Sequence, residues 1–197
     1  AGAGTTTAGL AFGGIGPGST MAVSTEEFGG SSWTSGGNLN TARRYLGGFG
    51  LQTAALAVSG AEPSLSTLVE NYNGTSWTEI SEVNTARREL SGSGTTTAGL
   101  AFGGGTPSVT GKTESWDGSS WTEVNDLSTA RARLAGATPS PSTVSLAFGG
   151  TDGSSDQSAT EEWAFSGIQP TDPAVGYADA ITGDFYYNST TGQFKNI

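Results

Sequence analysis

One short motif recurs four times along this chain of 197 residues, at intervals of roughly 44 to 46 residues. Its clearest part is Leu-Ala-Phe-Gly-Gly or a close variant, at residues 10–14, 56–60, 100–104 and 146–150. Repeats of this length are typical of solenoids, propellers and arrays, in which each unit packs against its neighbours. The recurrence therefore constrains the architecture more than the function, because a residue found in every unit is first of all a structural residue.

Other positions keep the same register. Each unit continues with a glutamate, then an aromatic residue two positions later, then a tryptophan within Ser-Trp-Thr, then an arginine within Thr-Ala-Arg. The glutamates are Glu26, Glu70, Glu114 and Glu161, and the aromatic residues are Phe28, Tyr72, Trp116 and Trp163. The tryptophans are Trp33, Trp77 and Trp121, and the arginines are Arg43, Arg87 and Arg131. The fourth unit loses its Ser-Trp-Thr after Trp163.

The sequence between these positions favours an all-β fold. No window holds the apolar spacing of a long helix, whereas short alternating runs such as 98–102 and 68–72 are bounded by turn residues. Glycine, at 32 of 197 residues, supplies those turns. Each unit holds about four such runs, which is the content of one blade of a β-propeller. The sequence predicts a propeller of four-stranded antiparallel blades.

The order of arginine, diglycine, aromatic residue and tryptophan resembles the kelch repeat. The diglycines are Gly13-Gly14, Gly103-Gly104 and Gly149-Gly150, whereas Ser59-Gly60 departs at its first position. The resemblance implies that the diglycine ends the second strand, the aromatic residue lies on the third and the tryptophan on the fourth. The wording Thr-Ala-Gly-Leu-Ala-Phe-Gly-Gly with Asn-Thr-Ala-Arg-Arg is similar to kelch-like repeats in virion proteins of marine and cyanobacterial phages.

The recurrent residues are interpreted here as structural. Glycine permits a positive φ and a close backbone approach, and tryptophan buries a large area between sheets. We expect Glu26, Glu70 and Glu114 to lie on third strands, near the arginine series, in pairs within or between blades. The alternative is that these positions form a ring of ligand-binding groups.

The ends of the chain differ from the repeats. We expect a repeat domain over residues 1–166, a linker over 167–183 and a hairpin over 184–197. The hairpin is similar to a segment of phage tail-fibre and capsid-fibre proteins, and it also resembles the outer half of a further blade. We therefore expect it to dock beside a blade, in this chain or in a neighbouring copy. The first residues start within a blade, which indicates a fragment, a processed product or part of a longer array.

Charge and composition argue against several functions. Eight basic and eighteen acidic residues give a net charge of −10, which does not favour nucleic acid or an anionic membrane surface. No apolar run reaches the roughly 20 residues of a membrane span. The chain has no histidine or cysteine, so the commonest general base and the thiol nucleophile are missing. We expect no enzymatic activity, no cofactor and no metal.

Specificity is expected where the sequence escapes the repeat, in the segments 15–23, 61–67, 105–112 and 151–159. The candidate binding residues in them are Pro17, Ser19, Glu62, Ser64, Thr106, Ser108, Asp152 and Asp156. Asp152 and Asp156 also suit calcium, although a solvated turn is the favoured interpretation because the spacing is not that of an EF-hand.

These features favour a non-enzymatic virion protein: a tail fibre, spike or capsid-decorating fibre located in a phage particle. Its expected partners are other virion proteins, copies of itself, and a host surface glycan or protein. The alternative is a secreted or cell-surface bacterial kelch-like adhesion module. A carbohydrate-active propeller enzyme with two carboxylates is the weaker alternative, because nothing in the sequence selects a carboxylate pair.

Overall fold

The computed structural model describes residues 1–137, 144–164, 185–188 and 193–196. The chain divides into two compact units, Ala1–Phe165 and Ser166–Ile197, and each is described by itself. The described residues form strands and one 3-10 turn, η1 (Pro17–Ser19), with no α-helix among them. No helix in this part of the chain is therefore long and apolar enough to cross a membrane. The all-β prediction is confirmed.

Four antiparallel sheets make up the first unit, one for each repeat. The first blade contains β1 (Gly2–Gly4), β2 (Gly9–Phe12), β3 (Thr25–Phe28) and β4 (Trp33–Ser35). The second contains β5 (Gly47–Leu51), β6 (Ala54–Val58), β9 (Val69–Tyr72) and β10 (Trp77–Ile80). The third contains β11 (Ser91–Gly94), β12 (Gly99–Phe102), β13 (Thr113–Trp116) and β14 (Trp121–Val124). The fourth contains β15 (Ala135–Gly136), β16 (Val144–Phe148) and β17 (Thr160–Ala164).

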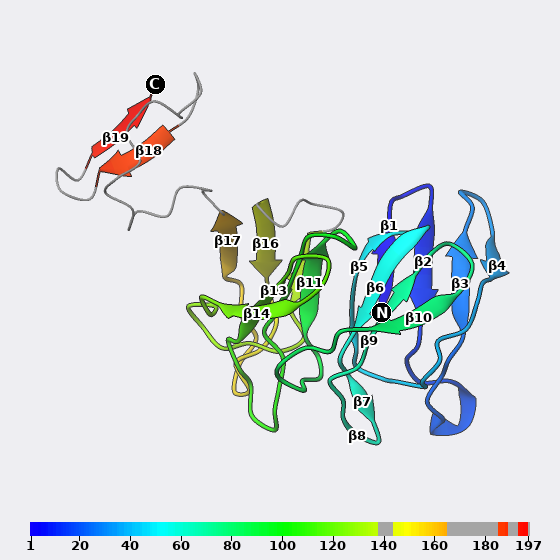
Figure 1. Cartoon of the computed structure of the whole chain (residues 1–197). Coiled ribbons are helices and arrows are strands. Elements are labelled where there is room, and N and C mark those ends of the chain that lie inside the picture. The colour runs from blue at the N-terminus through cyan, green and yellow to red at the C-terminus, as the bar shows by residue number, and fades with distance from the viewer. Residues whose placement is uncertain (138–143, 165–184, 189–192, 197) are drawn as a thin grey trace. The chain divides into compact units, whose positions relative to one another are not determined.

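The blades are arranged as a four-bladed β-propeller, as the repeat predicts (Figure 1). Within each blade, strands adjacent in the sheet run antiparallel, and the blade begins with its innermost strand. The innermost strands contact one another in the order β1, β5, β11 and β15. Each blade therefore packs on the next one along the chain through its innermost strand.

The strand positions implied by the kelch resemblance are those observed. The diglycines directly follow β2, β12 and β16, and the aromatic residues Phe28, Tyr72, Trp116 and Trp163 lie on third strands. Trp33, Trp77 and Trp121 each begin a fourth strand. The order of residues along each repeat is therefore the order of strands from the axis outwards.

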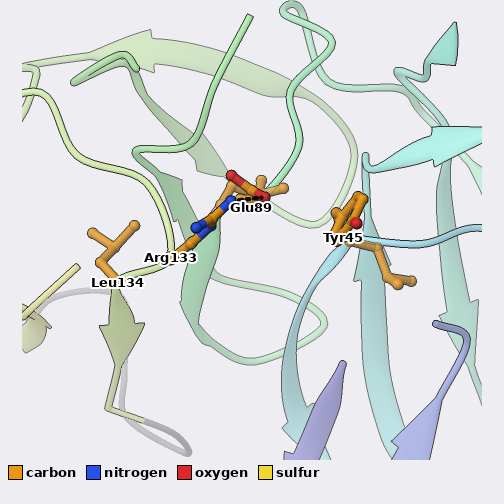
Figure 2. A pocket seen from close by; sticks show the side chains of 6 residues that line it. Tyr45, Glu89, Arg133 and Leu134 are labelled. Carbon is orange, nitrogen blue, oxygen red and sulfur yellow. Dashed lines mark hydrogen bonds and ion pairs between the residues drawn. The ribbon is translucent and has the colours of Figure 1, made fainter. Parts of the chain in front are cut away.

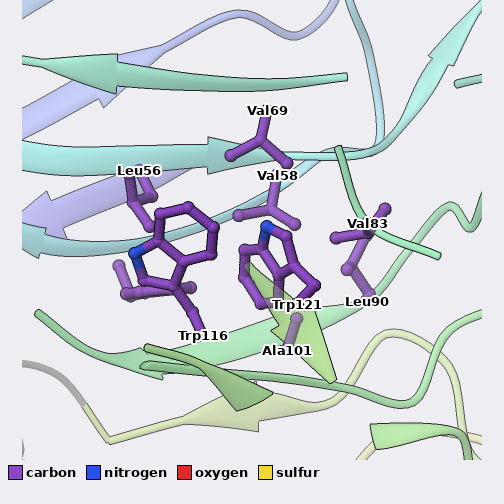
Figure 3. Packing of buried hydrophobic residues seen from close by; sticks show 9 residues of the cluster. Leu56, Val58, Val69, Val83, Leu90, Ala101, Trp116 and Trp121 are labelled. Atoms are coloured by element: carbon purple, nitrogen blue, oxygen red, sulfur yellow. The ribbon is translucent and has the colours of Figure 1, made fainter. Parts of the chain in front are cut away.

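The apolar core lies between blades. One cluster combines Leu56, Val58 and Val69 of the second blade with Trp116 and Trp121 of the third. Figure 3 shows the two indole rings packed against these aliphatic side chains. The rings of Trp116 and Trp121 lie 5.2 Å apart, on paired positions of β13 and β14. Burial of such large rings, about 150–250 Å² each, stabilises the contact between adjacent blades.

The turn after each second strand requires a left-handed backbone. Gly103 and Gly104 have φ of 66° and 100°, which only glycine adopts without strain. Ser59, where the motif departs from diglycine, has the same conformation at φ 57°. Its hydroxyl oxygen lies 2.6 and 2.8 Å from the carbonyl oxygens of Ser66 and Arg87, and its single proton is donated between these two acceptors. Those buried hydrogen bonds offset the cost of a non-glycine residue at this turn.

The second unit contains an antiparallel pair of strands, β18 (Phe185–Asn188) and β19 (Gln193–Asn196). The hairpin predicted near the carboxyl end is therefore present. The linker predicted at 167–183 and the turn between the two strands lie outside the described residues.

Candidate functional site

A buried network of arginine, glutamate and asparagine fixes each inter-blade connection. Arg43 Nη2 lies 2.9 Å from Glu70 Oε1, and Arg43 Nη1 donates to the Ser59 and Leu68 carbonyls at 2.9 and 2.6 Å. Asn40 donates its backbone and side-chain N–H groups to the second Glu70 oxygen at 2.7 and 2.9 Å. Burial lowers the pKa of Arg43, and the Glu70 carboxylate opposes that shift. The carboxylate is thus occupied on both oxygens.

The same network recurs at the next connection and, with one replacement, at the one after. Arg87 pairs with Glu114 at 3.1 Å, and Arg131 pairs with Glu161 at 2.6 Å. Ser128 takes the place of asparagine and donates its backbone N–H to Glu161. The predicted pairing of the two series is confirmed, but each arginine pairs with the glutamate of the following repeat. Glu26 has no arginine partner among the ion pairs of the described residues.

This network leaves the repeated charges with structural roles. A carboxylate held by an arginine and by N–H donors has no free lone pair directed at solvent, and neither member of the pairs Arg43–Glu70 and Arg87–Glu114 is exposed beyond 1%. A functional surface must therefore come from residues outside the network.

A second set of equivalent positions lies next to the arginines and does contact solvent. Tyr45, Glu89 and Arg133 each precede the innermost strand of a blade, and each has a left-handed backbone with φ of 58°, 58° and 56°. The Glu89 N–H donates to the Tyr45 carbonyl at 2.7 Å, and the Arg133 N–H donates to the Glu89 carbonyl at 2.8 Å. Backbone hydrogen bonds therefore link these three residues from one blade to the next. Non-glycine residues in this conformation cost roughly 1–3 kcal/mol each and gather at functional sites.

These three residues line a hollow of about 330 Å³ above a floor of Leu46, Leu90 and Leu134. Figure 2 shows Glu89 and Arg133 directed toward each other, with the Tyr45 ring on the opposite side. The Arg133 guanidinium lies 3.1 Å from the Glu89 carboxylate, and this hydrogen bond raises the pKa of Arg133. The Arg44 guanidinium lies 5.3 Å from the centre of the Tyr45 ring. We call the hollow lined by Tyr45, Glu89, Arg133 and the three leucines the axial hollow.

The axial hollow offers three kinds of contact on an apolar floor. A tyrosine ring stacks against apolar or sugar faces, a carboxylate accepts hydrogen bonds, and a guanidinium donates them in a planar fork. Concave sites with an apolar lining and a few convergent polar groups are the usual form of ligand sites. A neutral polyhydroxylated ligand suits this set, because its hydroxyl groups both donate to Glu89 and accept from Arg133.

The variable loops border the axial hollow through the backbone. Arg44, next to Tyr45, pairs with Ala61 at the start of the second loop, and Arg88 pairs with Gly105 at the start of the third. The fourth loop begins at Thr151, which pairs with Ala132. The hairpin β7 (Ala61–Glu62) and β8 (Ser64–Leu65) and the loop with η1 project from the same end of the repeat unit in Figure 1. The starts of the second, third and fourth loops therefore pair with the residues that directly precede Tyr45, Glu89 and Arg133 of the axial hollow.

The predicted loop residues fall into two groups. Pro17, Ser19, Ser64, Ser108 and Asp156 are exposed in their loops. Glu62 instead accepts a hydrogen bond from the Ser66 hydroxyl at 3.1 Å, and the Thr106 N–H donates to the Ser108 carbonyl. These contacts shape the loops from within, whereas the side chains of the exposed group lie on the surface of the loops.

The Asp152 side chain stabilises the turn in which it lies. Its carboxylate accepts the Ser154 and Ser155 N–H groups, both at 2.8 Å, and the Gln157 side-chain amide at 2.8 Å. The Ser155 N–H foremost lowers the pKa of Asp152. This arrangement is the solvated turn favoured by the sequence. No group of three or more acidic residues placed to hold a metal occurs among the described residues.

Sequence reasoning missed Tyr45, Glu89 and Arg133. The signal was present, because these residues occupy one position of Thr-Ala-Arg-x-x-Leu that is tyrosine, glutamate and arginine in successive repeats. A position that varies in chemistry inside an otherwise constant motif is a candidate for recognition. Neither the family models nor the curated proteins compared with this chain give a match.

Proposed function

We propose that this chain is a non-enzymatic phage virion protein of the kelch-like type, a tail fibre, spike or capsid-decorating fibre that recognises a surface glycan or protein of the host. Its scaffold is the repeated blade, and its recognition surface consists of the variable loops and the axial hollow. The proposal assigns it to the virion, with other virion proteins or copies of itself as partners.

The observation that carries this proposal is that each repeat combines constant buried residues with variable loops. Buried positions such as Arg43, Glu70 and Trp77 recur in sequence and in contacts, whereas the loops that border the axial hollow differ in sequence and in length. A rigid scaffold that holds variable loops on one side is the usual design of recognition proteins. The net charge of −10 makes a neutral or basic partner more favourable than nucleic acid.

Binding of the full chain to an array of bacterial surface polysaccharides, and to host cells, tests the recognition role. The variant Ser64→Lys/Ser108→Lys adds bulk at two exposed loop positions and is expected to weaken binding about tenfold or more. The matched control is Ser31→Lys, an exposed serine in the turn between β3 and β4, at the other end of a blade. Equal loss of binding in both variants would exclude the loop surface.

The virion assignment has its own test. Mass spectrometry of purified phage particles is expected to find the chain in fixed stoichiometry to the tail or capsid proteins. Its presence instead in the secreted or outer-surface fraction of a bacterium would favour the second candidate, a kelch-like adhesion module, which the same loop surface serves equally well.

A further inference from the structure

The turn between the third and fourth strands has the same backbone in three blades. The three turns are residues 29–32, 73–76 and 117–120. In each, the first N–H donates to the carbonyl of the fourth residue, at 3.0, 3.2 and 3.3 Å, and the second residue is a glycine with φ of 88°, 90° and 96°. The first residue is the one that changes, because it is Gly29, Asn73 and Asp117 in successive blades. One turn therefore holds three different side chains at its first position.

The Asn73 side chain is bound by the backbone of its own turn. Its Oδ1 accepts the Thr75 and Ser76 N–H groups, both at 2.9 Å. The residue is exposed to water. It belongs to the second blade, whose innermost strand packs on those of the first and third blades, so the surroundings of this turn are those of a blade inside the array.

The residue after Asn73 leaves the side-chain amide open to attack. Asn73–Gly74 is the one Asn-Gly pair in the sequence. Gly74 has no Cβ to hinder the approach of its own nitrogen to Asn73 Cγ. The Gly74 N–H also has no acceptor among the hydrogen bonds of the described residues, so no contact in this part of the chain holds the nitrogen away from that carbon.

We propose that Asn73 deamidates spontaneously in the folded protein and becomes an aspartate. The Gly74 nitrogen loses its proton to solvent and attacks Asn73 Cγ, so an N–Cγ bond forms, the Cγ–Nδ2 bond breaks and ammonia leaves. Water then adds to Cγ of the cyclic imide and breaks the N–Cγ bond, which restores the main chain and leaves a carboxylate. The net reaction consumes a water molecule and releases ammonia.

The turn places donors where negative charge develops in this reaction. As the Gly74 nitrogen attacks, Asn73 Oδ1 becomes an oxyanion, and two backbone N–H groups already lie 2.9 Å from that oxygen. Preorganised donors at about 2.7–3.1 Å are the arrangement that stabilises the oxyanion of acyl transfer. An unfolded chain does not hold these donors in place, so the folded turn favours the reaction.

The third blade shows how the turn accommodates the product. Asp117 Oδ1 accepts the Ser119 and Ser120 N–H groups, both at 2.8 Å, and the two serine hydroxyls donate to the same carboxylate at 2.8 and 3.0 Å. Thr75 and Ser76 offer equivalent hydroxyls to a carboxylate at position 73. The Ser120 N–H foremost lowers the pKa of Asp117. A carboxylate kept ionised is a poor electrophile, so the reaction ends at the aspartate.

The same turn disfavours the isomeric product. Addition of water to the main-chain carbonyl of the imide gives isoaspartate, which inserts a methylene into the main chain. The inserted atom is incompatible with both the hydrogen bond from the residue 73 N–H to the Ser76 carbonyl and the pairing of Tyr72 with Trp77. Aspartate is therefore the expected main product in the folded chain.

The experiment is incubation of the full chain at mildly alkaline pH, followed by digestion at acid pH and mass spectrometry with fragmentation that distinguishes aspartate from isoaspartate. Asn73 should react roughly tenfold or more faster than the exposed Asn125, which precedes Asp126; tenfold corresponds to about 1.4 kcal/mol in the barrier. The native chain should react at least as fast as the chain unfolded in urea. Slower reaction in the native chain would overturn the proposal, as would a rate at Asn73 no greater than at Asn125 or a product that is mainly isoaspartate.

The other blades supply the matched variants. Asn73→Gly introduces the residue of the first blade, and it should fold like the parent and gain no negative charge in this turn during incubation. Asn73→Asp introduces the residue of the third blade, and it should melt no earlier than the parent and coelute with the incubated parent in ion exchange. An incubated parent that elutes apart from Asn73→Asp would show a different product and refute the proposal. The inference does not depend on the proposed function.

Discussion

The Arg87 guanidinium lies 3.1 Å from the Glu114 carboxylate, and neither side chain is exposed to solvent. Two more hydrogen bonds run from Arg87 Nη1 to the carbonyls of Gly103 and Lys112, and Asn84 donates to the remaining Glu114 oxygen. Only Arg87 Nε lacks a partner, as in Arg43 and Arg131. The pair is therefore a joint: Arg87 comes from the connection between blades, and Glu114 lies on the third strand of the blade that follows.

Removal of one partner tests that joint. Arg87→Met keeps the bulk of the side chain but leaves the Glu114 carboxylate buried without its counter-charge, and it should lower the free energy of unfolding by about 3–5 kcal/mol. Lys112→Met is the matched control, because Lys112 and Glu123 form a pair exposed by 36% and 51%. Such an exposed pair contributes about 0–1 kcal/mol. Urea unfolding followed by tryptophan fluorescence measures both, and similar losses would refute the structural role of the network.

The close packing of the first two blades leaves no room for a side chain at Gly48. An alanine Cβ at Gly48 would lie 2.5 Å from Phe12 Cζ and 3.0 Å from the Gly2 carbonyl oxygen, so Gly48→Ala forces the first two blades apart. Overpacking of this kind costs about 1–3 kcal/mol. Gly29→Ala places its Cβ in open space and should change stability by about 0.5 kcal/mol at most. Thermal melts distinguish the two, and an unaffected Gly48→Ala would contradict the observed inter-blade distance.

Ser59 gives a test of the turn after the second strand. Ser59→Ala keeps the strained φ of 57° and loses the buried hydroxyl, which also accepts the Arg87 N–H at 2.9 Å. The loss should be about 1–3 kcal/mol. Ser59→Gly loses the same hydrogen bonds but relieves the backbone, so it should be the more stable of the two variants. The reverse order in urea unfolding would show that the strain at φ 57° is smaller than the conformational entropy that glycine adds to the unfolded chain.

Glu161 links stability to pH. Burial raises the pKa of this carboxyl, but hydrogen bonds from Ser128 and Arg131 outweigh it, so the folded pKa lies below its ordinary value. A depressed folded pKa contributes stability above the unfolded pKa of about 4.3, and the contribution is lost as pH falls through the folded pKa. Glu161→Gln should therefore be less stable than the parent at pH 7, and the difference should shrink below about pH 4.3. Glu162→Gln, at an exposed neighbour on the same strand, is the matched control at pH 7 and should change stability by about 0.5 kcal/mol at most.

The repeat period was sufficient to predict the propeller, and the resemblance to the kelch repeat implied the strand on which each motif lies. The diglycines, the third-strand aromatic residues and the fourth-strand tryptophans are local features, and a fixed period carries each of them from blade to blade. The pairing of Arg43 with Glu70 instead of Glu26 was beyond sequence reasoning. That choice depends on how the connection after β4 folds back between two blades, and both glutamates keep the same spacing in the repeat.

The axial hollow was missed for a different reason. Tyr45, Glu89 and Arg133 do not share a side-chain type, so a search for recurrent residues passes over them. What recurs at these positions is the left-handed backbone conformation. It could not be predicted from the residue types, because none of the three is glycine. The β7–β8 hairpin was likewise not predicted, because residues 61–67 were expected to form a variable loop.

Tyr45 separates the strain of the axial hollow from its side chain. Tyr45→Gly removes the ring and relieves the backbone at φ 58°, whereas Tyr45→Ala removes the ring and keeps the strain. We expect the glycine variant to be more stable than the alanine variant by about 1 kcal/mol, since left-handed backbone costs other residues about that much. If the hollow binds a polyhydroxylated ligand, both variants should lose affinity to the same extent, because both lack the ring that stacks on it. Calorimetric titration with a glycan found on the array, alongside urea unfolding, checks both expectations. Full affinity in Tyr45→Gly would place the ligand on the variable loops alone and leave the strained positions with a purely structural role.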